Sequence, residues 1–309
     1  MRKFIVSDLH GNGEVYDSIM AYLGNIDDEV ELYINGDLID RGLDSFRMFE
    51  EVIEAINGKG KIKIIYLGGN HELSMYQALL ERPPGRGINQ HSNWIDNGGW
   101  AIEGILDMRD DFEEKCEEYK QFLSNLKIFH EFEEVINNNK LVLVHAQVPQ
   151  NLDELRDLKI GHNNTAVQDA VWTRKEIRVP LIFGLGDVIG MNRIGKEDYL
   201  SIVGHTPVTD DRGFTYDHVE NYFNIDGGCA MYARGHFQFD HVPLVEVKDD
   251  YLKILIFNHN NEIIDGYYFE KYLLRMSNED LEKERLLLNH SYDNNGLENK
   301  KLIKELYER

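Results

Sequence analysis

Cysteine is scarce in this chain, and long apolar runs are absent from it. Only Cys116 and Cys229 occur, far apart and in unlike contexts, which excludes a disulfide framework and favours a reducing compartment. No uninterrupted apolar stretch approaches the roughly 18 residues that a membrane-spanning helix needs. The first predicted strand begins within three residues of Met1, which leaves no room for a signal peptide. We therefore expect a cytoplasmic protein with no membrane partner.

Positive charge is also in short supply. The chain has 33 lysines and arginines against 55 aspartates and glutamates, a net charge of −22. Because so acidic a protein repels polyanions at long range, extended binding of nucleic acid is not expected. A simpler account of the acidity is a solvated, charged surface, and we weigh that account as the stronger one.

Five apolar runs in the first two-thirds of the chain each end in a short polar motif. The runs are Lys3–Ser7, Val30–Asn35, Ile62–Leu67, Leu141–Val144 and Leu200–Val203, and each predicts a β-strand. The motifs that follow are D-L-H-G-N at 8–12, G-D-L-I-D-R-G at 36–42, G-G-N-H-E at 68–72, H-A at 145–146 and G-H-T-P at 204–207. The carboxyl ends of parallel strands line one crevice, so the motifs are expected to meet there.

The residue types in these motifs suit a pair of hard divalent cations. They offer oxygen and imidazole ligands and no thiolate: Asp8, His10, Asp37, Asn70, His145 and His205. Two ions about 3.5–4 Å apart can neutralise a phosphate ester and generate a hydroxide for in-line attack. The sequence therefore predicts a two-metal phosphoesterase site.

Together the motifs resemble the calcineurin-like metallophosphoesterase superfamily. G-D-x-x-D-R-G joined to G-N-H-E is similar to the phosphoprotein-phosphatase branch, with its bacterial and phage serine/threonine phosphatases and bis-nucleosyl-tetraphosphatases. Further agreement lies in residues 93–99, in Trp172-Thr-Arg174 and in residues 224–229, so the resemblance spans about residues 1–247. It implies an α/β fold, a two-sheet β-sandwich flanked by helices in four αββα layers, with a helical cap segment and a helical C-terminal tail.

The resemblance also implies which residues hold the metals. One ion would be bound by Asp8, His10 and the bridging Asp37. The second would share Asp37 and add Asn70, His145 and His205. The cofactor expected is a pair of divalent ions, with manganese first and iron or zinc as alternatives.

The remaining motif residues would bind and convert the substrate. A metal-bridging hydroxide would attack phosphorus while His71, oriented by Asp40, protonates the leaving oxygen. Arg41 would bind phosphate oxygens, because a planar guanidinium fits phosphate better than a lysine does. Arg174 would supply a second guanidinium, with weaker support because its motif is short. Asp226 lies in an Asp-Gly-Gly turn and is interpreted as structural.

Three functions fit these residues. Hydrolysis of phosphomonoesters comes first, on a phosphoprotein, as in serine/threonine protein phosphatases, or on a small phosphoester. Hydrolysis of dinucleoside polyphosphates comes second, because the same motifs serve both. A catalytically silent protein that binds a phosphorylated partner comes last, since the ligands and His71 are intact. Gln147, where many relatives have glycine, leaves substrate choice open, and nothing in the sequence indicates an oligomeric state.

The motif residues run from Asp8 to His205 and must meet at one point, which predicts one catalytic domain over residues 1–257. A helical C-terminal extension follows over 258–309. Helices are predicted at Glu14–Leu23 and Ser45–Ile56.

A charged helical segment at about 98–133 is either a cap beside the site or a solvated pair of helices. If its carboxylates face the mouth, they would repel a dinucleoside tetraphosphate.

The last third of the chain changes character twice. Strands are predicted at Val219–Ile225, Gly235–Val245 and Tyr251–Phe257, where apolar and polar residues alternate. Ser277-Asn-Glu-Asp280 predicts the start of a helix, and a second apolar stripe follows at Leu297, Leu302, Ile303 and Leu306.

Overall fold

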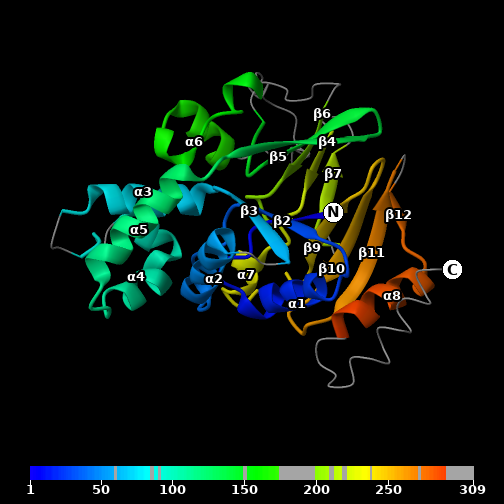
Figure 1. Ribbon diagram of the computed structural model, residues 1–309, viewed down its shortest axis with the longest axis horizontal. Coiled ribbons are helices and arrows are strands. Elements are labelled where there is room, and N and C mark those ends of the chain that lie inside the picture. The colour runs from blue at the N-terminus through cyan, green and yellow to red at the C-terminus, as the bar shows by residue number, and fades with distance from the viewer. Residues whose placement is uncertain are drawn as a thin grey trace, which may run out of the picture.

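The structure is a computed structural model, and it describes residues 1–58, 61–83, 87–89, 92–148, 152–173, 199–208, 212–217, 221–236, 239–270 and 273–289. Within these ranges the strands form two mixed sheets, and helices flank them (Figure 1). This architecture confirms the α/β two-sheet fold that the motifs predict.

The larger sheet holds the first three motif strands. It consists of β1 (Arg2–Val6), β2 (Val30–Asn35), β3 (Ile62–Leu67), β9 (Val242–Val247), β10 (Leu252–Phe257), β11 (Ile263–Phe269) and β12 (Leu273–Arg275), in the order β12-β11-β10-β9-β1-β2-β3. β1, β2 and β3 pair in parallel, with Ile5 opposite Tyr33, whereas the other pairings are antiparallel. The three parallel strands therefore end at the same edge.

The smaller sheet holds the other two motif strands. It consists of β4 (Phe129–Ile136), β5 (Asn139–Val144), β6 (Tyr199–Val203), β7 (Thr215–Asp217) and β8 (Tyr222–Asn224), in the order β4-β5-β6-β8-β7. β5, β6 and β8 are parallel, and the edge strands β4 and β7 pair antiparallel to their neighbours. Its parallel strands therefore also share one carboxyl edge.

Strands in both sheets are buried on both faces. On β1, Ile5 lies in the core between the sheets, whereas Phe4 and Val6 lie in the core that the helices cover. On β5, Leu143 and Val144 divide between the two cores in the same way. Side chains alternate along a strand, so burial on both faces requires an unbroken apolar run. This is the signal by which the motif strands are recognised in the sequence.

Helices cover the outer faces of the sheets. The described helices are α1 (Gly13–Gly24), α2 (Ser45–Asn57), α3 (Asn70–Glu81), α4 (Trp100–Leu106), α5 (Phe112–Asn125), α6 (Thr165–Trp172), α7 (Cys229–Tyr232) and α8 (Asn278–Asn289), with short helical turns at Ile95–Gly99, Leu152–Glu154 and Ile160–His162. α1 and α8 pack together beside β10 and β11, and α2 packs on β3. Figure 1 shows α6 beside the smaller sheet. No helix in these ranges combines the length and apolar character that crossing a membrane requires.

The segment predicted as a helical cap is helical only in its first part. α4 packs on α2 and α5 packs on α3, but β4 begins at Phe129 and joins the smaller sheet. A register shift between Glu131 and Val135 interrupts the alternation of buried and exposed residues along β4. The sequence therefore lacks the regular pattern that predicts a strand.

The C-terminal region also differs from the expectation. The strand predicted at Gly235–Val245 begins only at Val242, because Gly235 and His236 continue the turn that follows α7. Residues 258–309 were predicted to be helical, yet β11 and β12 extend the larger sheet. α8 begins after Ser277, whose Oγ accepts from Asp280 N at 3.1 Å, as its helix-start motif predicts. The domain division at 257 stays a prediction, and the second apolar stripe lies outside the described residues.

Candidate metal centre

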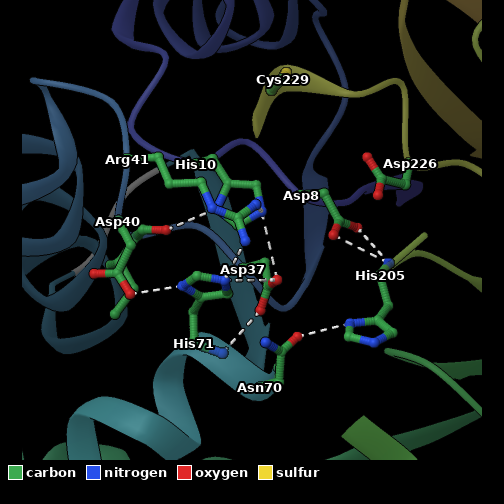
Figure 2. Close-up of polar contacts among 12 residues, drawn as sticks. Asp8, His10, Asp37, Asp40, Arg41, Asn70, His71, His205, Asp226 and Cys229 are labelled. Atoms are coloured by element: carbon green, nitrogen blue, oxygen red, sulfur yellow. Dashed lines mark hydrogen bonds and ion pairs between the residues drawn. The ribbon is translucent and has the colours of Figure 1, made fainter. Parts of the chain in front are cut away.

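Six parallel strands bring their polar loops to one place. Asp8 and His10 follow β1, residues 37–41 follow β2, and Asn70 and His71 open α3 after β3. His145 follows β5, His205 follows β6, and Asp226 follows β8. Figure 2 shows Asp37 at the centre of these side chains. The carboxyl edges of both sheets thus build one site from segments far apart in the sequence.

The backbone at this site is strained. Six residues adopt a positive φ: Asp8, His10, Asp37, Asp40, Arg41 and His205, with values from 45° to 73°. All other described non-glycine residues with positive φ are asparagines, which tolerate this conformation better than most. Such strain persists only where the surroundings enforce it, and it concentrates at functional sites.

Asp37 lies between two groups of potential metal ligands. Its Oδ2 is 3.5 Å from His10 Nε2, and its Oδ1 is 3.3 Å from His145 Nε2. Ligand atoms lie within 4.8 Å of one another in two buried clusters, one of His10, Asp37 and His71 and the other of Asp37, His145 and His205. Asp37 is common to both, with one oxygen directed to each side. Carboxylate oxygens with imidazoles and no thiolate fit a pair of hard or borderline divalent ions.

Hydrogen bonds orient three of the imidazoles toward this centre. His10 Nδ1 contacts the carbonyl oxygen of Ile39 at 3.1 Å, and His145 Nδ1 contacts that of Asn35 at 2.8 Å. His205 is turned the other way, with Nε2 at 3.1 Å from Trp172 O. A carbonyl only accepts, so each of these nitrogens carries a proton, and the other ring nitrogen is the one available to a metal.

Asn70 completes the second group. Its Oδ1 lies 2.7 Å from His205 Nδ1 and 3.1 Å from His145 Nε2, the two ring nitrogens that do not face a carbonyl. Three atoms that can each ligate a metal therefore converge on one spot.

His71 is held differently from the other three imidazoles. Its Nδ1 lies 2.6 Å from Asp40 Oδ2, a carboxylate rather than a carbonyl, and its Nε2 lies 2.9 Å from Arg41 Nη2. Trp94 donates its Nε1–H to Asp40 Oδ1 at 2.9 Å, which fixes the carboxylate. Arg41 only donates, so Nε2 accepts in this contact and Nδ1 donates to Asp40. The role of Trp94 was not foreseen, although its motif is part of the family resemblance.

Asp8 lies beside these clusters but outside them. Both of its oxygens accept from His205 N, at 3.0 and 3.1 Å, and Ser7 Oγ donates to Oδ2. A Cβ on Gly204 would stand 2.0 Å from Asp8 Oδ2, so only glycine allows the two strands to approach this closely. Asp8 therefore ties the end of β1 to the end of β6, across the two sheets.

Glu72 organises the loops beneath the site. It is fully buried, and its oxygens accept from Gly69 N at 2.7 Å, Asp37 N at 2.9 Å and Leu38 N at 3.2 Å. Tyr66 donates its hydroxyl to the same carboxylate at 2.5 Å. Sequence reasoning gave Glu72 no role, though its place in the G-N-H-E motif was the available signal.

Electrostatics at the site follows from burial and crowding. Burial raises the pKa of Asp8 well above its usual range, and the nearby Asp226 carboxylate raises it further. Burial alone would raise the pKa of Asp37 and lower that of His145. Instead the His145 and His71 charges hold the pKa of Asp37 low, and Asp37 and Asp8 raise the pKa of His145 to about 10. Burial and the charge of Asp37 raise the pKa of Asp226 to about 6, so this carboxylate belongs to the site's electrostatics as well as to a turn.

The structure thus brings together all but one of the residues that the motifs single out. Arg174 lies outside the described residues. Gln147 is partly buried, and its backbone N–H donates to Ala170 O at 3.2 Å.

Comparisons with known proteins agree with this fold. A family model described as calcineurin-like phosphoesterase matches residues 1–243. A protein serine/threonine phosphatase from Saccharomyces cerevisiae superposes with a TM-score of 0.50 at 13% identity, over 88% of this chain and 80% of that chain. A cold-active protein-tyrosine phosphatase from a psychrophilic Shewanella species gives 0.48 at 13% identity, over 87% and 80%.

A putative diadenosine tetraphosphatase gives a TM-score of 0.45 at 12% identity, over 82% of this chain and 93% of that chain. No curated protein matches this chain. At such low identity the likeness concerns the fold alone.

Proposed function

The chain belongs to the calcineurin-like phosphoesterase family, and we propose that it is a metal-dependent hydrolase of phosphomonoesters. The observation that carries the proposal is the pair of opposed oxygens on Asp37, each directed to its own group of ligands. One ion would be held by Asp8, His10 and Asp37, and the other by Asp37, Asn70, His145 and His205. Manganese comes first as the ion, with iron or zinc as alternatives.

Two divalent ions in such a site would neutralise the phosphate charge and supply a nucleophile from water. The protein's own side chains would do the rest. Arg41 offers a guanidinium beside both His10 and His71, where it can bind phosphate oxygens. His71, held by Asp40 and backed by Trp94, would give a proton from Nε2 to the leaving alcohol once Arg41 turns from this nitrogen to the phosphate.

The substrate class is the least constrained part of the proposal. The predicted repulsion of dinucleoside polyphosphates required the carboxylates of the segment 107–118 to face the mouth of the site. In the structure several of them pair with cationic side chains instead, Asp111 with Arg109, Glu113 with Arg82, and Glu118 with Lys115. Repulsion by this segment therefore gives no reason to prefer phosphopeptides. We propose a phosphoprotein or a small phosphomonoester as substrate, for a protein that works in the cytoplasm.

A side-by-side activity screen tests the proposal. The metal-reconstituted protein would be assayed on phosphopeptides, nucleoside monophosphates and diadenosine tetraphosphate at fixed ionic strength, with His71→Asn as the matched inactive control. We expect phosphate release from the monoesters that depends on added metal and on His71. A specificity constant for the tetraphosphate about ten times that for the best phosphopeptide would replace the proposed substrate class, since a tenfold ratio is about 1.4 kcal/mol.

A further inference from the structure

The segment after β8 lies next to the metal-centre loops. Asp226 Oδ1 accepts from Gly228 N at 2.9 Å, and α7 begins at the next residue, Cys229. Asn12 Nδ2, in the loop that carries His10, donates to Cys229 O at 3.3 Å. Figure 2 shows Asp226 and Cys229 on one stretch of backbone beside the site. A displacement of α7 would therefore disturb both this loop and Asp226.

The other end of α7 is held by His259. The Tyr232 ring stacks on the His259 ring at 3.5 Å between centroids, with 5° between their planes. Asp240 Oδ1 accepts from both the backbone nitrogen and Nδ1 of His259, each at 2.6 Å. Tyr232 is the last residue of α7, so the helix ends on an imidazole whose orientation a carboxylate fixes.

The segment that carries Asp240 also packs on the start of α7. A Cβ on Gly228 would stand 2.3 Å from Cδ1 of Phe239, the residue before Asp240. Gly228 also has a φ of 82°, a conformation that only glycine adopts readily. His259 is thus joined to both ends of α7, through Tyr232 at one end and through Asp240 and its neighbour at the other.

One nitrogen of the His259 ring is buried without a partner. The residue is 4% exposed, and among the described residues nothing forms a hydrogen bond with Nε2. Because Nδ1 donates to Asp240, the neutral ring leaves only a lone pair on Nε2. A second proton would add an N–H donor and a positive charge at a place where nothing accepts them, and burial penalises that form.

The titratable groups that act on His259 come from three parts of the fold. Asp240 lies before β9, Glu14 lies on α1, and Tyr232 lies on α7. Burial lowers the pKa of His259 below its ordinary value of 6.5, and the Asp240 and Glu14 carboxylates offset only part of this change. The Asp240 side chain is 28% exposed, so water solvates part of the charge that would stabilise a protonated ring. Burial raises the pKa of Tyr232, which stays uncharged.

We propose that protonation of His259 releases α7 from the metal-centre loops. In the released state the imidazole is in water and takes up a proton more readily than in the folded state, so acid favours release. The contact is at full strength above pH 6.5, the ordinary imidazole value, and weakens as the pH falls below it. Any consequence for hydrolysis would rest on the proposed function, whereas the release itself does not.

The thiol of Cys229 provides the readout. It is 1% exposed at the start of α7, so it should react with dithiodipyridine only when the helix opens. Cys116→Ser leaves Cys229 as the only cysteine. The rate of thiopyridone release would be measured at pH 7.5 and pH 5 on the metal-loaded protein, with metal content checked at both. Dividing by the rate of the urea-unfolded chain at the same pH removes the thiol's own pH dependence.

We expect this relative rate to rise severalfold at pH 5. The ordinary imidazole pKa of 6.5 sets a ceiling of about 30-fold at that pH. His259→Phe keeps a ring for Tyr232 but takes up no proton, so its relative rate should change by less than about twofold. The Asp226 carboxylate, whose pKa is about 6, is still present in this variant, so any effect of its titration would remain.

Asp240→Asn should change the pH dependence in the opposite direction. The amide keeps an oxygen that accepts from His259 Nδ1, but the counter-charge of the protonated ring is gone, so the rise at pH 5 should exceed that of the wild type. His130→Phe is the matched control, because His130 is a histidine on β4 whose pKa burial lowers to about 4. It should leave the rise at the wild-type value.

Three outcomes overturn the inference: no rise in the wild type, the wild-type rise in His259→Phe, or a rise in Asp240→Asn no larger than that of the wild type. The thiol rates do not depend on catalysis. If the protein releases phosphate from no monoester, the proposed function fails while the Cys229 rates still decide whether α7 is released. Activity on monoesters without acid-dependent reaction of Cys229 supports the proposed function and overturns the release.

Discussion

The two ends of β1 carry buried charge in opposite arrangements. At the amino end, Arg2 pairs with Glu246 of β9 at 2.6 Å, and Lys253 of β10 reaches both Glu246 and Glu284 of α8. Tyr22 donates its hydroxyl to Glu284 and extends this ionic cluster to α1. At the carboxyl end, Asp8 lies beside two further buried carboxylates, Asp37 and Asp226. Paired charges of opposite sign therefore lie at the amino end of β1, whereas several carboxylates lie together at its carboxyl end.

The pKa values separate the two groups clearly. Burial alone would raise the pKa of Glu246, but Arg2 and Lys253 lower it to about 2. The pKa of Asp8 is raised instead, because burial and Asp226 act in the same direction. A buried charge that the protein neutralises with its own side chains holds elements together. Buried acids crowded among imidazoles, on a strained backbone, are the arrangement expected where an external cation completes the charge balance.

Asp37→Asn removes the central carboxylate of the crowded group at the carboxyl end of β1 and should have the largest effect. Asparagine offers one carboxamide oxygen in place of two carboxylate oxygens, so neither ligand group keeps its shared ligand. We expect activity to fall to the background of the metal-free protein and metal content, by elemental analysis, to fall with it. The metal-free variant should unfold at a lower urea concentration than metal-free wild type, because Asp37 is the main counter-charge that raises the pKa of His145. Two retained ions per chain would contradict the bridging role.

His71→Asn tests whether the fourth imidazole differs from the other three. Because Asp40 rather than a carbonyl holds His71, we expect metal content to stay at the wild-type level. Hydrolysis of alkyl phosphates should slow by about 10²–10⁴-fold, the usual contribution of a general acid. An aryl phosphate with a good leaving group needs less protonation and should lose less, and Asp40→Asn should show a milder version. Equal losses on both substrates would assign His71 another task.

Glu246→Gln removes the carboxylate that pairs with Arg2 and Lys253 at the amino end of β1. Removing one member of a buried ion pair leaves Arg2 and Lys253 without their counter-charge, which costs about 3–5 kcal/mol in unfolding free energy. Glu131→Gln, at an exposed pair with Lys140, is the control and should cost less than about 1 kcal/mol. Urea unfolding measures both. Below the unfolding transition, kcat of Glu246→Gln should equal that of the wild type, and a large drop in kcat would mean that the two ends of β1 are coupled.

Acid should remove the same stabilisation without a mutation. The folded pKa of Glu246 is lowered to about 2, below the ordinary value of 4.5, so its contribution is full above pH 4.5 and fades as pH falls toward 2. We therefore expect the difference in unfolding free energy between wild type and Glu246→Gln to shrink over that window by roughly 3 kcal/mol. A difference that stays constant between pH 6 and pH 3 would show that the pairing does not depend on the Glu246 charge.

The two ends of β1 also differ in how much of their structure the sequence predicts. The strands and helices around the metal centre agree with the sequence within about two residues at each boundary, β2 and β3 among them, because long apolar runs end in motifs of fixed chemistry. At the amino end, Glu246 and Glu284 are single carboxylates in ordinary elements, and only the folded chain brings them to Arg2. Pairing over 244 residues leaves no local pattern to recognise.

The predictions that are wrong in the C-terminal third also concern segments whose structure is set by contacts distant in sequence. β11 carries Asp265 and Gly266 at its middle and follows an asparagine-rich loop, so its sequence suits a loop as well as a strand. Gly235 and His236, predicted to begin a strand, instead close the turn after α7, which tertiary contacts of Tyr232 hold in place. Residue type and spacing locate the metal ligands, whereas the end of α7 depends on packing.

The smallest expected effect concerns the contacts that hold the end of α7, and it compares an aromatic contact with the ion pairs at the amino end of β1. His259→Leu removes both the ring that stacks on Tyr232 and the hydrogen bond of that side chain to Asp240. Stacked rings contribute about 0.5–1.5 kcal/mol, so the unfolding free energy measured in urea should fall by about that amount, less than for Glu246→Gln. His259→Phe keeps the ring and should retain most of this stability. If both variants lose it equally, the hydrogen bond to Asp240 is the stabilising contact. If neither does, α7 is held by its anchored start at Cys229 alone.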